Sequence, residues 1–232
     1  MLVNKSAKSL FLLVLMLCSS LPAFAQIKVA CVGNSITYGS GIKNRTAYSY
    51  PAQLQLILGN EWEVKNFGVS GRTMLKKGNQ PLWKEKAFSD ALAYQPDVVI
   101  IKLGTNDSKD FNWKYKDEFS VDYQAMIDTF TQVSNPMIFV CRPVPAFGNQ
   151  WNIDSLVIVD EVIPQIEAVA QSNDLQVIDL FNPFQNHKAL FPDLIHPNGH
   201  GAALMAGIIS KYLLKSYTQI LENKINNHHK KN

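Results

Sequence analysis

A serine and a histidine that lie far apart in the chain are the residue types that nucleophilic catalysis requires. Ser35 follows the apolar run Ile27–Val32 within Gly-Asn-Ser-Ile-Thr, and His196 lies within Asp-Leu-Ile-His-Pro-Asn-Gly. A serine hydroxyl is a weak nucleophile and needs a base to accept its proton. Asp193 lies three residues before His196, so a compact loop could hold its carboxylate against the imidazole and fix the tautomer. The sequence therefore predicts a triad of Ser35, His196 and Asp193.

Two further motifs provide candidate donors for an oxyanion, which acyl transfer requires. Gly71 lies in Gly-Val-Ser-Gly-Arg, and Asn106 lies in Gly-Thr-Asn-Asp. We expect the backbone N–H groups of Ser35 and Gly71 and the side-chain amide of Asn106 to form the oxyanion hole. Taken singly, Gly71 fits a tight turn and Asn106 fits a loop cap equally well.

Several other residues offer competing interpretations. His187 and His200 are alternatives to His196, although His200 falls inside an expected helix. Cys31 and Cys141 lie near strand ends and lack a Cys/His motif, which favours buried free thiols over a disulfide or a thiol nucleophile. Two loop carboxylates, Asp107 and Asp110, could ligate a metal but more often cap or face solvent, and we predict no metal site.

Apolar runs alternate with helical patterns along the chain, which favours βαβ units and a parallel sheet. The expected strands are Ile27–Val32, Glu63–Phe67, Val98–Leu103, Met137–Cys141 and Leu175–Leu180. The expected helices are Tyr48–Leu58, Pro81–Tyr94, Lys116–Val133, Ile153–Ser172 and Gly199–Tyr217. The sequence thus predicts a three-layer α/β/α, flavodoxin-like domain with a five-stranded parallel sheet. Since each motif follows a strand, the motifs should meet at one edge of that sheet.

The N-terminal segment reads as a targeting sequence. Lys5 and Lys8 precede the apolar run Leu10–Leu17, and Ala23-Phe24-Ala25 is a cleavage site of small residues. We expect residues 1–25 to be a signal peptide and the protein to be periplasmic or secreted; a lipoprotein anchor through Cys18 is disfavoured by the bulky residues before it. Residues 26–217 form the domain, and residues 218–232 a polar, frayed C-terminal tail. The run Leu10–Leu17 is too short to span a bilayer, and no other segment qualifies.

The 232-residue chain has a formal net charge of only +3, which gives no indication of a nucleic-acid partner. No feature specifies an oligomeric state. The Gly-x-Ser-x-Gly elbow fails at Arg72, and the segment Gly33–Lys43 matches no nucleotide-binding spacing.

The four motifs together resemble the SGNH hydrolases, the superfamily of GDSL-type esterases and lipases. Ser35, Gly71, Asn106 and His196 match its four named residues in the right order, from Ile27 to about Tyr212. The resemblance implies a flavodoxin-like fold, no metal or organic cofactor, and ester hydrolysis through an acyl-serine. One departure is Asn34, where the family usually has aspartate. The Gly-Asn-Ser-Ile-Thr form resembles the branch of sialate O-acetylesterases and related carbohydrate acetylesterases.

The expected substrate is a short acyl ester of a sugar or another small ester, because no long apolar insertion could form a lipase lid. The alternatives are a lysophospholipase or thioesterase acting on longer chains, and a non-catalytic carbohydrate-binding module on the same fold. Arg72 and Arg142 follow strand ends and are candidate substrate-binding residues. Trp83, Trp113 and Trp151 fit either sugar stacking or helix packing.

Overall fold

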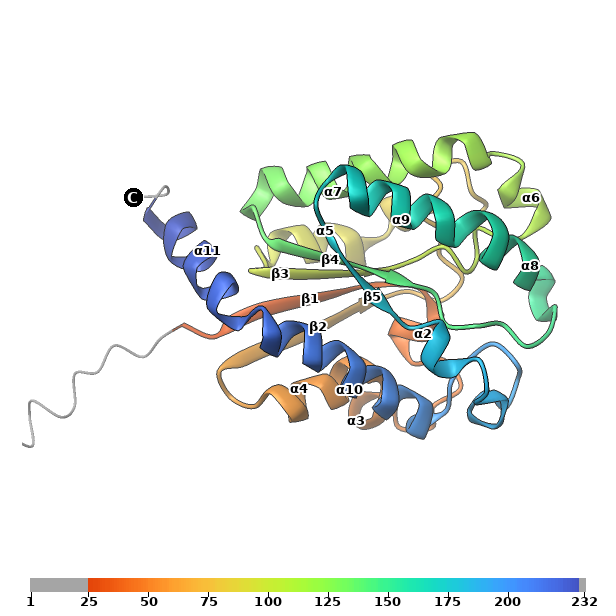
Figure 1. Cartoon of the computed structure of the whole chain (residues 1–232), viewed down its shortest axis with the longest axis horizontal. Helices are drawn as coiled ribbons and strands as arrows, with labels where there is room; N and C mark the ends of the chain where they lie inside the picture. The colour runs from red at the N-terminus through yellow and green to blue at the C-terminus, as the bar shows by residue number, and fades with distance from the viewer. Residues whose placement is uncertain (1–24, 230–232) are drawn as a thin grey trace, which may run out of the picture.

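Five parallel strands form the centre of the molecule in the order β2-β1-β3-β4-β5 (Figure 1). They are β1 Ile27–Gly33, β2 Trp62–Gly68, β3 Val98–Lys102, β4 Met137–Arg142 and β5 Gln176–Asp179. Every neighbouring pair runs parallel. The predicted sheet is confirmed, and the strand limits differ from the expected ones by no more than one residue.

The computed structural model describes residues 25–229. The expected signal-peptide features, including Leu10–Leu17 and Cys18, lie outside the described residues. Between residues 25 and 229, no helix has both the length and the apolar character needed to cross a membrane.

Helices cover both faces of the sheet, which gives the three layers that the sequence predicts (Figure 1). Helices α5, α7 and α9 lie over one face, and α3, α4 and α10 lie over the other. The helices are α2 Ser35–Tyr38, α3 Arg45–Tyr48, α4 Tyr50–Leu58, α5 Lys86–Ala93, α6 Asp110–Trp113, α7 Phe119–Ser134, α8 Ser155–Val157, α9 Ile163–Ser172, α10 Gly199–Lys215 and α11 Tyr217–His229. Short 3₁₀ turns lie at Leu82–Lys84, Lys116–Glu118, Gln150–Asn152, Asn182–Phe184 and Lys188–Leu190.

Strand β3 shows how the sheet separates two hydrophobic cores. All of its residues are buried, as a strand covered on both faces requires. Val98 and Ile100 pack into the cluster beneath α4 and α10, whereas Val99 and Ile101 pack into the cluster beneath α5, α7 and α9. Each such side chain contributes about 1.5–3 kcal/mol when it is fully buried, so β3 anchors the loop that follows it.

The segment expected as one helix over Ile153–Ser172 is interrupted. Helix α8 leads into a π-helical turn at Ile158–Val162, and α9 follows with Pro164 in its first turn. Proline lacks an N–H, and its ring clashes with the carbonyl four residues earlier in a regular helix. The wider π turn accommodates that ring.

The C-terminal segment differs from the frayed tail that the sequence favours, because it forms helix α11. Ile220 is only 1% exposed. The Tyr217 hydroxyl donates to Glu61 at 3.0 Å, and the Lys224 ammonium lies 2.6 Å from the Asp97 carboxylate. These long-range contacts hold the helix against the rest of the domain at the amino ends of the strands.

Candidate active site

The catalytic candidates lie at the point where the sheet changes winding direction. Strands β1 and β3 are neighbours, and the chain leaves them toward opposite faces of the sheet. Ser35 comes directly after β1, and Asn106 lies in the loop after β3. In open α/β sheets, ligands bind in the crevice at such a point, outside the carboxyl ends of the strands.

Ser35, His196 and Asp193 form one chain of hydrogen bonds. The His196 Nε2 atom lies 2.8 Å from the Ser35 Oγ atom, and its Nδ1 atom lies 2.8 Å from Asp193 Oδ2. The other carboxylate oxygen of Asp193 accepts the backbone N–H groups of Ile195 at 3.0 Å and His196 at 2.7 Å. This geometry allows His196 to accept the serine proton while Asp193 fixes the ring.

The Asp193 carboxylate is held in its ionised form. Partial burial raises the pKa of Asp193. Hydrogen bonds together lower the pKa by a larger amount; they come from the backbone and imidazole N–H groups of His196 and from the Ile195 N–H. The net pKa therefore lies below its ordinary value. An ionised carboxylate beside Nδ1 stabilises the positive charge that His196 acquires when it takes the serine proton.

The short helix α2 presents Ser35. Its N-cap residue Asn34 is buried, and the Asn34 side-chain oxygen accepts the Ile36 N–H at 3.1 Å. Asn34, which stands where the family usually has aspartate, therefore still supplies a side-chain acceptor for this turn. Its amide nitrogen has no hydrogen-bond partner within the described part of the chain. A Cβ atom on Gly33 would lie 2.7 Å from the Lys102 carbonyl oxygen, so only glycine fits before this turn.

Gly71 and Asn106, the residues expected to complete the oxyanion hole with Ser35, both line the pocket at Ser35. Gly71 has φ of 81°, a conformation that strains other residues. The Asn106 amide donates to the Arg72 carbonyl at 3.1 Å. An amide carries two N–H bonds, so this contact orients the group and leaves the second N–H for a ligand.

Asp107 joins the loops that carry Gly71 and Asn106. Its buried carboxylate accepts the backbone N–H groups of Met74 at 3.1 Å and Leu75 at 2.8 Å. Burial raises the pKa of Asp107 to about 6, while these backbone N–H groups oppose the shift. Asp107 thus acts as a structural acceptor between the two loops.

A fully buried lysine lies beneath the loop after β3. The Lys102 Nζ atom donates to the Thr105 hydroxyl at 3.3 Å, and Thr105 immediately precedes Asn106. Burial lowers the pKa of Lys102 to about 7. The sequence pattern alone gave no reason to single out this residue.

A small pocket of about 250 Å³ opens over Ser35 and His196. Its walls include residues that none of the catalytic motifs indicates, among them Lys109 and Ile153. The signal that could have identified Lys109 is its position three residues after Asn106, in the same loop. The lining residues are Ser35, Ser40, Ser70, Gly71, Asn106, Lys109, Trp151, Ile153 and His196.

Arg72 and Arg142 do not line this pocket. The Arg72 side chain binds Glu85 and donates to the Ser70 carbonyl at 2.7 Å. Arg142 pairs with Glu167 and with Asp179, the latter at 3.2 Å. Both guanidinium groups are therefore occupied within the protein, which does not favour the substrate-binding role that the sequence suggested for them.

Of the remaining aromatic and histidine candidates, only Trp151 lies at the pocket. Trp83 donates to the Met74 carbonyl at 2.7 Å, and Trp113 is buried against Phe119. His187 and His200 are exposed and lie outside the pocket lining.

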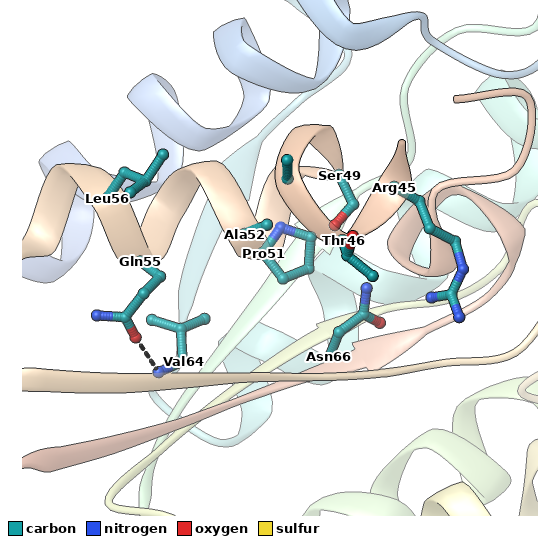
Figure 2. Close-up of a pocket in the computed structure, with 10 residues that line it drawn as sticks. Arg45, Thr46, Ser49, Pro51, Ala52, Gln55, Leu56, Val64 and Asn66 are labelled. Carbon is teal, nitrogen blue, oxygen red and sulfur yellow. Dashed lines mark hydrogen bonds between the residues drawn. The ribbon is translucent and has the colours of Figure 1, made fainter. Parts of the chain in front are cut away.

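A larger hollow of about 500 Å³ lies elsewhere, between α3, α4 and the outer edge of β2 (Figure 2). Arg45, Thr46, Ser49 and Asn66 contribute its polar groups. It contains none of the predicted catalytic residues. On its floor, the Gln55 side chain accepts the Val64 N–H at 2.7 Å and donates to the Trp62 carbonyl at 3.0 Å.

The cysteines do not compete with Ser35 as nucleophiles. Cys31 and Cys141 are free and buried, as the sequence predicts. Burial raises the pKa of both thiols, that of Cys141 to about 12, so neither forms the thiolate that reacts. No group of three or more His, Cys, Asp or Glu side chains within residues 25–229 is arranged to hold a metal ion.

The parallel sheet with a serine, a histidine and an aspartate at its carboxyl edge is the architecture of a hydrolytic α/β domain. Residues 31–204 match the sequence profile of the GDSL-like lipase/acylhydrolase family, and the chain belongs to this family. The predicted resemblance to GDSL-type esterases is thereby confirmed.

An acetylxylan esterase from Xylanibacter ruminicola is 49% identical over 203 residues, which cover 79% of this chain and 42% of that protein. The chain thus spans less than half the length of this relative.

Solved structures share the fold at lower sequence identity. An acetyl xylan esterase has a TM-score of 0.65 at 23% identity, covering 81% of this chain and 100% of its own. A carbohydrate acetylesterase from Sinorhizobium meliloti has a TM-score of 0.64 at 17% identity, covering 82% of this chain and 99% of its own. At these identities the likeness concerns the fold alone.

Proposed function

We propose that this protein is a serine esterase that removes acetyl groups from acetylated carbohydrates, with acetylated xylan as the first substrate to test. The observation that carries the proposal is the hydrogen-bonded chain from Ser35 Oγ through the His196 ring to Asp193, with 2.8 Å at each step. The acetylxylan esterase that is 49% identical supports the substrate class.

The reaction begins when the Ser35 oxygen attacks the acetyl carbonyl carbon and His196 Nε2 takes the hydroxyl proton. The tetrahedral intermediate collapses, the bond to the sugar oxygen breaks, and His196 returns its proton to that oxygen. Water then attacks the acetyl-serine, again losing its proton to His196, and acetate leaves as Ser35 is reprotonated.

The negative oxygen of each intermediate needs fixed donors. We assign this role to the backbone N–H groups of Ser35 and Gly71 and to the Asn106 side chain. Ser35 opens helix α2, where the first N–H groups have no partner within the helix. Donors that are already oriented need no rearrangement when the charge develops, so they lower the activation free energy by a large amount.

The dimensions of the pocket favour a small acyl group. A volume of about 250 Å³ suits an acetyl group better than the long chain of a lysophospholipid or a fatty thioester. Acetylated sialic acids carry the same acetyl ester bond, so they are included among the substrates of the experiment below.

We further propose that the protein is exported. The basic residues, the apolar run Leu10–Leu17 and the small residues at Ala23 and Ala25 support a signal peptide that ends at Ala25. Sequencing the amino terminus of the protein from the periplasm or the medium should give Gln26. An amino terminus at Cys18, or recovery of the intact chain with Met1 in the cytoplasm, would contradict this.

The decisive experiment measures acetate release by purified protein from acetylated xylan, acetylated mannan, acetylated sialic acid and 4-nitrophenyl acetate. Ser35→Ala serves as the matched control because it removes only the hydroxyl oxygen. We expect release from acetylated xylan by the wild type and a loss of at least about 10³-fold in the variant. Equal release by both proteins would refute the esterase function, and a preference for sialic acid would replace the proposed substrate.

A further inference from the structure

Trp151 is an exposed aromatic side chain directly beside the base of the triad. Its ring centroid lies 5.2 Å from that of His196, with 55° between the ring planes. The side chain lines the same pocket as Ser35 and is nonetheless 55% exposed. A large, partly exposed apolar ring therefore lies in the wall of the pocket that contains Ser35.

The backbone at Trp151 is held in an unfavourable conformation. Trp151 has φ of 55° and Asn152 has φ of 61°, in the left-handed region that bulky L-residues avoid. An exposed ring recovers little of this cost through burial. Backbone strain of this kind persists only where surrounding structure enforces it, and it concentrates at ligand-binding sites.

The residues that follow Trp151 provide that enforcement. Ile153 is buried against Ile158 and Ile195, the neighbour of His196. The Asp154 N–H donates to the Ser108 hydroxyl at 3.1 Å, and the Asp154 carboxylate caps the start of α8. The backbone that carries the indole is thus anchored beside His196.

Lys109 also lines this pocket, and its side chain carries an ammonium group. Its side chain is partly buried; burial lowers its pKa, and the charge of the Asp107 carboxylate opposes that shift. No hydrogen bond or ion pair involves its ammonium group within residues 25–229. An ammonium has three N–H donors. A partly buried ammonium without a hydrogen-bond partner is stabilised when a ligand offers it oxygen acceptors.

We propose that Trp151 and Lys109 form the subsite for the sugar ring that carries the acetyl ester. A pyranose presents an apolar C–H face, which stacks on an indole, and an edge of hydroxyl and ring oxygens, which accept from an ammonium. A simple alkyl alcohol presents neither. The proposal rests on the proposed esterase function and adds the part of the site that recognises the leaving alcohol.

The test compares kcat/KM on an acetylated xylooligosaccharide with kcat/KM on ethyl acetate, whose leaving alcohol is too small to stack. Trp151→Ala removes the ring but keeps the Cβ atom, so the backbone strain is the same in both proteins. We expect the sugar-to-ethyl ratio to fall about tenfold in Trp151→Ala, to fall in Lys109→Met, and to be largely retained in Trp151→Phe. Tyr48→Ala removes another aromatic ring that is 55% exposed but outside the pocket, and should leave the ratio unchanged.

An unchanged ratio in both Trp151→Ala and Lys109→Met would overturn the subsite. If Trp151→Ala lowered both rates equally and displaced the pH profile, the ring would serve only to position His196, which also overturns the proposal. These outcomes differ from failure of the esterase function itself, in which the wild type would hydrolyse neither ester.

Discussion

Replacing the buried pair Lys102 and Thr105 by Met and Val should stabilise the protein, and by an amount that depends on pH. Lys102 is fully buried, and its one hydrogen bond within the described residues goes to the Thr105 hydroxyl at 3.3 Å. The double variant Lys102→Met/Thr105→Val removes the ammonium together with that hydroxyl, so that no buried polar atom of the pair is left without a partner.

The magnitude follows from the lowered pKa of Lys102. The pKa of Lys102 falls from 10.5 to about 7 on folding. Burial therefore disfavours the charged form of the side chain relative to the neutral form by about 5 kcal/mol. Between these pH values the unfolded chain binds a proton that the folded chain does not, so wild-type stability rises with pH across this window. Below about pH 7 the Lys102 ammonium is charged in the folded protein, and the free energy of unfolding is reduced by the full cost of burying that charge.

Urea denaturation of both proteins at pH 6.5 and pH 9.5 measures this difference, because all other titrating groups are shared. We expect the double variant to be the more stable protein at pH 6.5. Its advantage should shrink by about 3 kcal/mol at pH 9.5, since each pH unit above the folded pKa changes the difference by about 1.4 kcal/mol.

A stability difference that is the same at both pH values would refute the reasoning, because it would mean that Lys102 titrates alike in the folded and unfolded chains. Thr105→Val alone is the control for the hydroxyl and should show no such pH dependence. A double variant that fails to fold would equally contradict the expectation of increased stability.

Three further outcomes are expected from the site and its surroundings. Asn106→Ala should lower kcat by on the order of 10²–10³ without changing the circular dichroism spectrum; a kcat near that of the wild type would remove Asn106 from the oxyanion hole. Asp193→Asn should lower kcat by on the order of 10⁴ through the wrong imidazole tautomer. Because the Asp193 pKa is lowered, the wild type should also lose the stability that this carboxylate contributes as pH falls below about 4, and denaturation of the variant should lack that part of the acid dependence. Arg142→Ala should lower Tm by breaking the pairs with Glu167 and Asp179 while leaving KM unchanged; a raised KM at unchanged Tm would restore Arg142 as a substrate-binding residue.

The strands and the candidate triad could be predicted because their signals are local. The run Val98–Ile101 is apolar on both faces, and Ser35 and Asn106 each follow closely after a strand of this kind. The motif of Asp193 and His196 follows β5 after a longer loop. Parallel topology then brings Ser35 and His196 together although 161 positions separate them.

Features that depend on distant partners could not be predicted in this way. Helix α11 has a polar sequence, and it is held by the buried Ile220 and by the Lys224–Asp97 ion pair. The salt bridges of Arg142 likewise require knowledge of which strands are neighbours. The left-handed turn at Trp151 has no glycine to mark it, so its sequence gives no indication of the conformation.

Within residues 25–229, strand β2 lies at the border of the sheet, and backbone groups on its outer side have no neighbouring strand. Such borders are sites where a second copy of a protein can add a strand and begin to aggregate. The Gln55 amide occupies the Val64 N–H and the Trp62 carbonyl on that side, imitating the hydrogen bonds that an incoming strand would make. One side chain of helix α4 thereby leaves fewer free backbone groups at this border for a second copy to pair with.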